Sequence, residues 1–230
     1  MKSWIFTDGL AVWANESVGL SFEQSKLSAG IKLRHHATKI TFRLFALQPP
    51  NDGVVFTSPT NLTLCGSSLR FVLPQSDSFP VQTEVASHVF ETNAAIAGID
   101  MVLSVGTQQL HAQSEIELCS RFGDAGRASP VCQENLASQA KGAWTLFRLD
   151  NTDYSYLEML LPADFHSSQV SHDPGTGHGT LRHRLFSCSL EKGVILRAKL
   201  RGLLLPREGD EAAAAKFVDE FLASPPPLGR

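Results

Sequence analysis

The chain has no long apolar run, little net charge and no closely spaced cysteines. No segment of the 230 residues contains the roughly 18–20 uninterrupted apolar residues that a membrane-spanning helix needs. The N-terminus also has no apolar stretch of the secretory type before its first acidic residue, Asp8. We therefore expect a cytoplasmic protein that does not bind a membrane.

Charge and composition narrow the class of partner. The formal net charge is -3, and the pI is near 6.2. Such a chain lacks the general positive field that attracts nucleic acid, so we expect no nucleic-acid partner, and any anion site must be local. A hydrophobic content of 43% is that of a globular protein. We expect residues 1–230 to form one β-rich domain, with a boundary between two lobes in 123–142 as the alternative.

The four cysteines and the missing motifs exclude several kinds of site. Because Cys65, Cys119, Cys132 and Cys188 form no Cys-x-x-Cys pair, we expect free and mostly buried thiols. A Cys119–Cys132 bridge is the alternative for a secreted protein. The sequence has no phosphate loop, no dinucleotide fingerprint and no Gly-x-Ser-x-Gly elbow. It therefore predicts no cofactor.

Hydrophobic residues recur with a period close to two, which is typical of β-strands. This holds for Lys39–Leu47, Ser68–Leu73 and Gln82–Phe90, which are also rich in Val, Ile, Phe and Thr. Asp8-Gly9 separates two short apolar segments and favours a tight hairpin turn. The pattern predicts a mainly β fold, with an antiparallel β-sandwich or a barrel-like sheet.

The middle of the chain predicts one or two further strands. Residues 99–122 alternate, with one face formed by Leu110, Ala112, Ser114, Ile116 and Leu118. The polar, Gly- and Ala-containing stretch 123–142 is interpreted either as a long loop or as a short helix through 131–140.

The C-terminal segment predicts the α-helix of the fold, at about 210–223. Asp210 can cap its N-terminus, and the alanines that follow favour a helix. An apolar stripe at three- and four-residue spacing consists of Phe217, Val218, Phe221 and Leu222. We expect this helix to cover a face or an edge of a sheet.

The last predicted hairpin concentrates positive charge. It joins 181–189 to 194–205, and its register places Arg184 opposite Lys199 and Arg182 opposite Arg201. With Arg197, five cations would share one surface, which favours binding of an acidic glycan or another anion. The alternative is that Glu115 and Glu117 lie on a neighbouring strand and neutralise the patch.

A second candidate site lies on the hairpin around Asp150. Both tyrosines of the chain, Tyr154 and Tyr156, share one strand face with Glu158, and the register places Phe147 opposite Tyr156. An aromatic strip that ends in a carboxylate is typical of sugar binding. The alternative is that a second layer covers the strip and makes it core.

Four histidines, His166, His172, His178 and His183, lie close together in the sequence, beside Asp164 and Asp173. Their spacing matches no helical pair such as His-Glu-x-x-His, and a Gly-containing loop is a poor frame for coordination, so we predict no metal site.

Two functions remain. The first is a binding or scaffold module for a glycan or another small anionic ligand, at Tyr154, Tyr156, Glu158 or at the five cations, with a protein partner as a further option. The alternative is a carbohydrate-active hydrolase or lyase that uses His166 or Glu158 for proton transfer.

Overall fold

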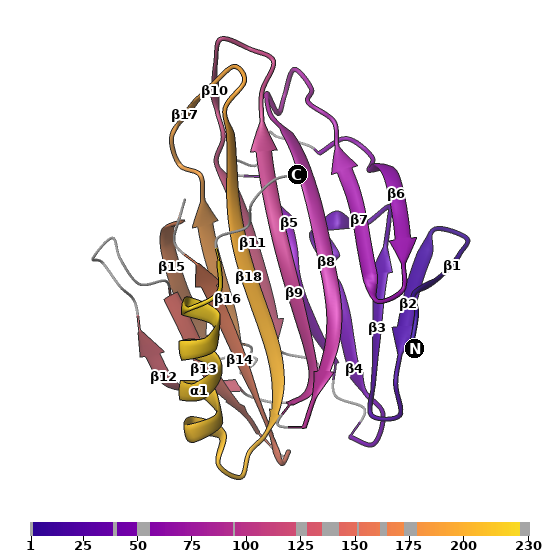
Figure 1. Ribbon diagram of the computed structural model, residues 1–230, viewed down its shortest axis with the longest axis vertical. Helices are drawn as coiled ribbons and strands as arrows, with labels where there is room; N and C mark the ends of the chain where they lie inside the picture. Colours follow the sequence, from indigo (N-terminus) through magenta and orange to yellow (C-terminus); the bar gives the residue numbers. More distant parts are fainter. Residues whose placement is uncertain are drawn as a thin grey trace.

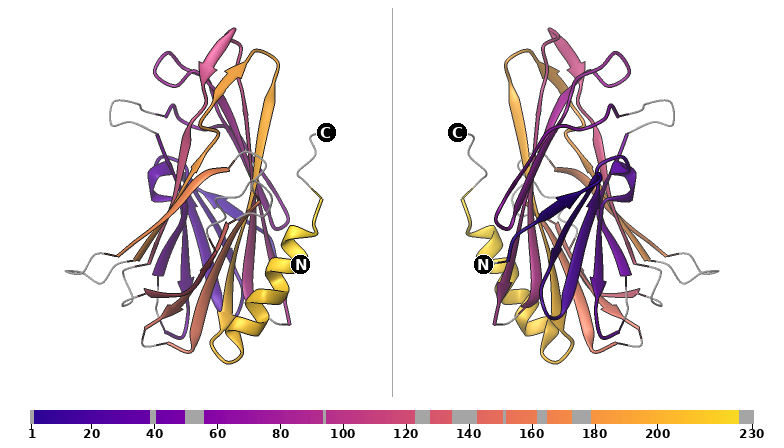
Figure 2. Two further views of the ribbon diagram at one scale, coloured as in Figure 1. Left: turned by 90° about the vertical axis from the view of Figure 1, so that its left-hand side faces the viewer. Right: turned by 90° about the vertical axis from the view of Figure 1, so that its right-hand side faces the viewer.

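Two open antiparallel sheets stack face to face, with one helix on the outside of the second sheet (Figure 1, Figure 2). The computed structural model describes residues 2–38, 41–49, 56–93, 95–122, 128–134, 143–150, 152–161, 165–172 and 179–225. Of residues 128–134, 143, 165, 166 and 172 it describes the backbone alone. The predicted antiparallel sandwich with a C-terminal helix is confirmed, and because neither sheet closes, the fold is not a barrel.

Sheet A contains most of the N-terminal strands. In spatial order it consists of β1 (Ile5–Thr7), β2 (Leu10–Ala14), β3 (Val18–Glu23), β4 (Ile31–His35), β5 (Thr41–Gln48), β11 (Ile116–Phe122), β16 (Gly179–Leu185) and β15 (Phe165–His172). A short 3-10 helix (Leu27–Ala29) precedes β4. The predicted hairpin at Asp8-Gly9 is confirmed, since both residues have positive φ and Thr7 pairs with Leu10.

Sheet B forms the second layer. In spatial order it consists of β12 (Ala128–Glu134), β13 (Ala143–Leu149), β14 (Tyr154–Leu161), β18 (Ile195–Pro206), β9 (Ala95–Gly106), β8 (Gln82–Thr92), β7 (Ser68–Leu73) and β6 (Thr60–Cys65). A separate two-stranded ribbon pairs β10 (His111–Gln113) with β17 (Ser189–Glu191).

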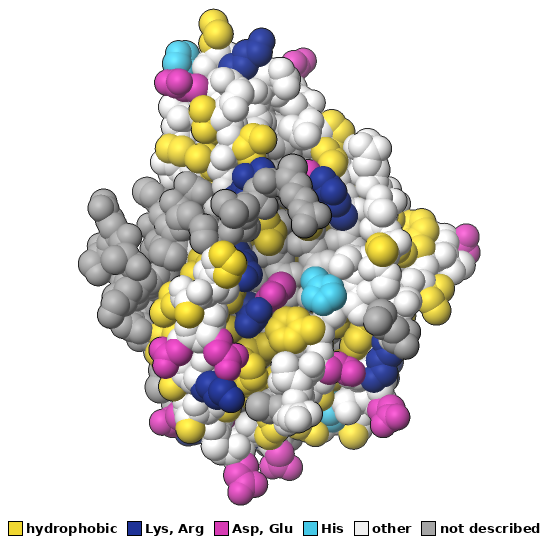
Figure 3. Space-filling model, viewed as in Figure 1, with side chains coloured by type: hydrophobic (Ala, Val, Ile, Leu, Met, Phe, Trp, Pro, Cys, Tyr) yellow, Lys and Arg dark blue, Asp and Glu magenta, His cyan; other side chains and the backbone are white. Residues whose placement is uncertain are grey.

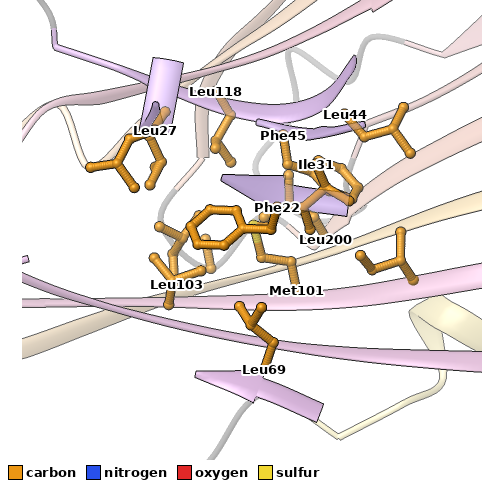
Figure 4. Close-up of a cluster of buried hydrophobic side chains, with 14 of the residues drawn as sticks. Phe22, Leu27, Ile31, Leu44, Phe45, Leu69, Met101, Leu103, Leu118 and Leu200 are labelled. Atoms are coloured by element: carbon orange, nitrogen blue, oxygen red, sulfur yellow. The ribbon is translucent and has the colours of Figure 1, made fainter. Parts of the chain in front are cut away.

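The main hydrophobic core fills the space between the sheets. Alternation explains this, because strands such as β4 bury every second residue. Figure 4 shows Phe22, Leu44 and Leu118 of sheet A facing Met101 and Leu200 of sheet B. The core therefore depends on the inward side chains of both sheets.

A second apolar cluster lies on the outer face of sheet B. The helix α1 (Asp210–Leu222) packs Phe217, Val218 and Phe221 against β13, β14 and β18. Most of the predicted stripe is confirmed, but Leu222 is 37% exposed. Because α1 covers β14 from outside and sheet A covers it from inside, β14 is buried on both faces.

The predicted cap at Asp210 is wrong. Gly209 holds the N-cap position with a φ of 73°, and the helix has no side-chain cap. The Asp210 carboxylate instead accepts two hydrogen bonds of 2.9 Å from the Arg148 guanidinium and one of 2.6 Å from Ser155 Oγ. These bonds join the start of the helix to β13 and β14.

Two other expectations need correction. Residues 99–122 contain parts of three strands, and Leu110, placed on the buried face, is 77% exposed because it precedes the separate ribbon strand β10. The stretch 123–142 contains the strand β12 where a helix was one interpretation. Strands from both sides of this stretch pair within both sheets, and the one-domain organisation stays a prediction. None of the described helical residues makes a segment long and apolar enough to cross a bilayer.

The Arg148–Asp210 pair predicts how stability depends on pH. The hydrogen bonds from Arg148 lower the pKa of Asp210 from 3.8 to about 2. A carboxyl group with a lowered folded pKa stabilises the fold above its unfolded pKa and loses this effect as the pH falls through the folded value. We expect Asp210→Asn to reduce the free energy of unfolding near neutral pH, and the deficit to shrink between pH 3.8 and about 2.

Urea unfolding of the wild-type protein and of Asp210→Asn across this pH range measures the difference in their free energies of unfolding. Asp219→Asn on the exposed face of α1 is the matched control and should show no such convergence. A deficit of Asp210→Asn that stays constant down to pH 2 would contradict the assignment.

Candidate functional site

The prediction that residues 181–189 and 194–205 form a hairpin is wrong, because β16 and β18 lie in different sheets. β16 pairs with β11 and β15 in sheet A, whereas β18 pairs with β14 and β9 in sheet B. Between them, β17 pairs with the distant β10. The five predicted cations therefore do not share one surface, and Arg184 lies opposite Glu117 instead of Lys199.

Arg182 and Arg184 lie on the outer face of sheet A beside acidic residues. Arg182 Nη1 is 3.4 Å from Glu117 Oε1, and Arg184 Nε is 3.3 Å from Glu115 Oε1. The alternative in which Glu115 and Glu117 neutralise cations holds for these two arginines, with Glu117 on β11 and Glu115 just before that strand. Both arginine side chains are nearly half exposed, so these ion pairs contribute little to stability.

Arg197, Lys199 and Arg201 lie on the opposite outer face, that of sheet B. The Arg201 guanidinium makes bonds of 2.6 and 2.8 Å to Asp100 and lies over the rings of Phe90 and Phe221. Figure 3 shows Lys and Arg atoms against Asp and Glu atoms beside the helix. Arg201 thus connects α1 to the sheet.

Lys199 also contacts the helix. Its ammonium donates to Ser224 Oγ at 3.0 Å and lies over the Phe221 ring. Burial lowers the pKa of Lys199, and the neighbouring Arg201 adds to the effect. Arg197 lies farther along β18 and pairs across the sheet with Ser104.

A different row of cations lies on the outer face of sheet A. Lys32 of β4 pairs directly with Arg43 of β5, which pairs directly with Arg121 of β11. All three side chains are exposed, and none makes an ion pair with an acidic residue in the described ranges. We call Lys32, Arg43 and Arg121 the cation row.

The predicted aromatic strip lies largely in the core. The register is confirmed, since Phe147 pairs with Tyr156. Tyr156 is fully buried and packs near Phe42 and Phe122. Tyr154 is half-buried, with its ring 4.4 Å from that of His35. Tyr156 is therefore not available as a surface platform for a sugar.

Glu158 is the most unusual residue of the core, because its carboxylate is 0% exposed between the sheets. Oε2 accepts hydrogen bonds from Tyr156 OH at 2.6 Å and from Ser120 Oγ at 2.7 Å. Oε1 lies 2.8 Å from Nε2 of His183. A buried carboxylate needs such donors, and here they come from β14, β11 and β16.

Local backbone features make room for this network. A register shift between β5 and β11 turns Ser120 inward, where its Oγ accepts a 3.1 Å bond from the Phe45 amide, and Phe45 has a φ of 53°. Across from Glu158, Gly202 leaves space for Tyr156, since a Cβ at Gly202 would lie 2.5 Å from the Tyr156 hydroxyl.

The network continues from His183 to the edge of the sandwich. Ser168 of β15 is the direct cross-strand partner of His183, and its Oγ lies 2.5 Å from Nδ1. Ser168 is half-buried, whereas His183 is 1% exposed. A chain of hydrogen bonds thus runs from a partly open serine through His183 to Glu158. Burial and the neighbouring Glu158 raise the pKa of Tyr156, so its hydroxyl stays a donor.

The sequence singled out Glu158 and Tyr156 but not their partners. His183 was placed in a cluster of loop histidines, although it shares an apolar strand phase with Leu181 and Leu185. This shared alternation with Leu181 and Leu185 was the feature of the sequence that indicated a buried His183. The side chains of His166, His172 and His178 lie outside the described residues. In the described residues, no three potential metal ligands gather.

The comparisons with known proteins establish the fold. No protein-family profile matches the chain, and no curated protein matches its sequence. A provisionally assigned aldose 1-epimerase from Klebsiella pneumoniae subsp. pneumoniae MGH 78578 has a TM-score of 0.58 at 8% identity, over 98% of this chain and 90% of that one. One from Escherichia coli K12 has a TM-score of 0.52 at 9% identity, over 90% and 99%. At such identities the similarity is one of fold alone.

The Glu158 network predicts a large effect of a small substitution. Glu158→Gln keeps the shape but replaces an acceptor-only group with an amide, so that one buried partner loses its bond. We expect a loss of about 1–3 kcal/mol in the free energy of unfolding, measured in urea. Glu84→Gln, which breaks the exposed pair with Arg70, is the control and should change it by less than about 1 kcal/mol. Equal effects of the two substitutions would contradict the role given to Glu158.

Proposed function

We propose that the protein is a β-sandwich binding module that holds an acidic glycan on the outer face of sheet A. The cation row carries this proposal. Lys32, Arg43 and Arg121 lie directly opposite one another on three adjacent strands. Like charges in such positions destabilise a sheet. A bound anion turns this repulsion into attraction.

The neighbouring residues extend the positive surface. Arg34 lies two residues from Lys32 on the same exposed face of β4. Arg182 lies on the same face of sheet A, although Glu117 partly neutralises it. A ligand with several carboxylate or sulfate groups would contact more than one of these side chains. Guanidinium groups bind such groups through two parallel hydrogen bonds.

A glycan is the ligand class best supported among anions. Two structures of the same fold are provisionally assigned as aldose 1-epimerases, whose substrates are sugars. The cytoplasmic location and the lack of a nucleic-acid partner stay predictions.

The alternative function, a carbohydrate-active hydrolase or lyase, has less support. Glu158 was one of its two candidate proton-transfer groups, and Glu158 is fully buried between the sheets. A sugar on either outer face does not reach this carboxylate. The other candidate, His166, has a side chain outside the described residues. Binding therefore explains the described geometry better than sugar hydrolysis at Glu158.

Binding of dextran sulfate and of unmodified dextran, measured by isothermal titration calorimetry at low ionic strength, tests the proposal. The two polymers share a backbone and differ in charge. We expect the protein to bind dextran sulfate and not dextran. Arg43→Gln, which removes the central charge of the row, should weaken binding by about 10- to 150-fold, since a charge-assisted hydrogen bond contributes about 1.5–3 kcal/mol.

Arg70→Gln is the matched control, because it removes the same charge from the outer face of sheet B. It should leave the dissociation constant within about twofold. Equal weakening by the two substitutions would mean that binding depends on total charge, and the cation row would not be the site. Failure of the wild-type protein to bind dextran sulfate would also overturn the proposal.

A further inference from the structure

Ser168 lies on β15, an edge strand of the sandwich. β15 is the last strand of sheet A, and β12 is the last strand of sheet B on the same side (Figure 1). Along β15, Ser167 and Gln169 are exposed, while Ser168 and Val170 are half-buried. Ser168 therefore points toward the interior from a strand that, in the described part of the chain, has β16 as its one neighbour in the sheet.

The hydrogen bonds around His183 give this serine an unusual environment. With Glu158 ionised, its oxygens can only accept, so Nε2 of His183 carries a hydrogen and donates to Oε1 over 2.8 Å. Nδ1 of the neutral imidazole is then an acceptor, and the Ser168 hydroxyl donates to it over 2.5 Å. Serine, histidine and carboxylate thus form a continuous chain in the order that nucleophilic catalysis requires.

The rest of the network holds the imidazole in place. Tyr156 and Ser120 both donate to Oε2 of Glu158, which fixes the carboxylate that faces His183. His183 itself is 1% exposed, so bulk water has little access to its ring. Preorganised groups of this kind need little rearrangement when charge develops on the imidazole.

We propose that Ser168 is a nucleophile activated by His183, and that it accepts the acyl group of a small carboxylic ester at the β15 edge of the sandwich. Ser168 Oγ attacks the ester carbonyl carbon, and its proton moves to Nδ1 of His183. The carbon–oxygen bond to the alcohol then breaks, and the departing oxygen takes the proton from Nδ1. Glu158 acts as a positioning residue that stabilises the transient imidazolium.

The same groups release the acyl chain. Water gives a proton to Nδ1 and attacks the acyl carbon, which frees the carboxylic acid. The bond to Ser168 Oγ breaks, and Oγ recovers the proton from Nδ1. The step consumes one ester and one water and requires no cofactor. It is independent of the cation row, which lies on the outer face of sheet A.

Covalent labelling with a fluorophosphonate probe tests this proposal on the full chain. The serine oxygen replaces fluoride on phosphorus, and the added mass is located by mass spectrometry of peptides. We expect the native protein to be labelled at Ser168. Ser168→Ala should abolish the added mass, whereas Ser167→Ala, which alters the adjacent exposed serine, should leave the labelling rate unchanged.

A second measurement tests whether His183 acts as a base or only supports the fold. His183→Ala should slow labelling of Ser168 by about 100-fold or more, the usual contribution of a general base. Added imidazole should restore part of the rate, because a free base can occupy the space of the missing ring. Thermal unfolding of the variant shows whether it stays folded during the assay.

Three results would overturn the proposal. One is equal labelling of Ser167 and Ser168 in the native protein, and another is the absence of labelling at Ser168. The third is a folded His183→Ala variant in which Ser168 is labelled slowly and added imidazole does not raise the labelling rate. His183 would then have a structural role only. Dextran sulfate binding should be unaffected by Ser168→Ala in every case, which separates this test from that of the cation row.

Discussion

A carboxylate buried between two sheets has to find hydrogen-bond donors on both of them, and this constraint on Glu158 organises the centre of the protein. Tyr156 donates from the same strand, while Ser120 and His183 come from sheet A. Sliding one sheet past the other would separate Glu158 from Ser120 and His183 and leave these buried polar groups unpaired. The apolar core supplies most of the stabilisation, and the Glu158 network specifies the alignment.

The cations on the two outer faces have different roles, because α1 packs on sheet B and not on sheet A. On sheet B, α1 buries an apolar cluster, and Arg201 is held by Asp100, Phe90 and Phe221. Cations there support the docking of the helix. The helix α1 contacts strands of sheet B, whereas the cation row lies exposed on the outer face of sheet A. The same residue types thus have structural roles on one face and are available to a ligand on the other.

Local patterns in the sequence predicted local structure well. Alternation and turn residues located the hairpin of β13 and β14 and placed Phe147 opposite Tyr156. The apolar spacing of Phe217, Val218 and Phe221 located the helix and its buried side. These features depend on residues a short distance apart, for which spacing alone determines which side chains are neighbours.

Features that depend on distant strands could not be predicted. The register of β16 with β18 was wrong because β17 pairs with β10 and the chain then enters the other sheet. The cation row joins Arg43 to Arg121, which are neighbours only because β11 inserts beside β5. Glu158 was recognised as a candidate, but its burial depends on which sheet covers β14. Alternation predicts a face, not what lies against it.

The most direct test of this account is a double-mutant cycle between Glu158 and His183, with unfolding free energies measured in urea. Residues in one buried hydrogen-bond network are coupled, so the effects of Glu158→Gln and His183→Gln should differ from additivity by about 0.5–3 kcal/mol. Additivity within about 0.3 kcal/mol would mean that the two residues act independently. That result would contradict the claim that this contact aligns the two sheets.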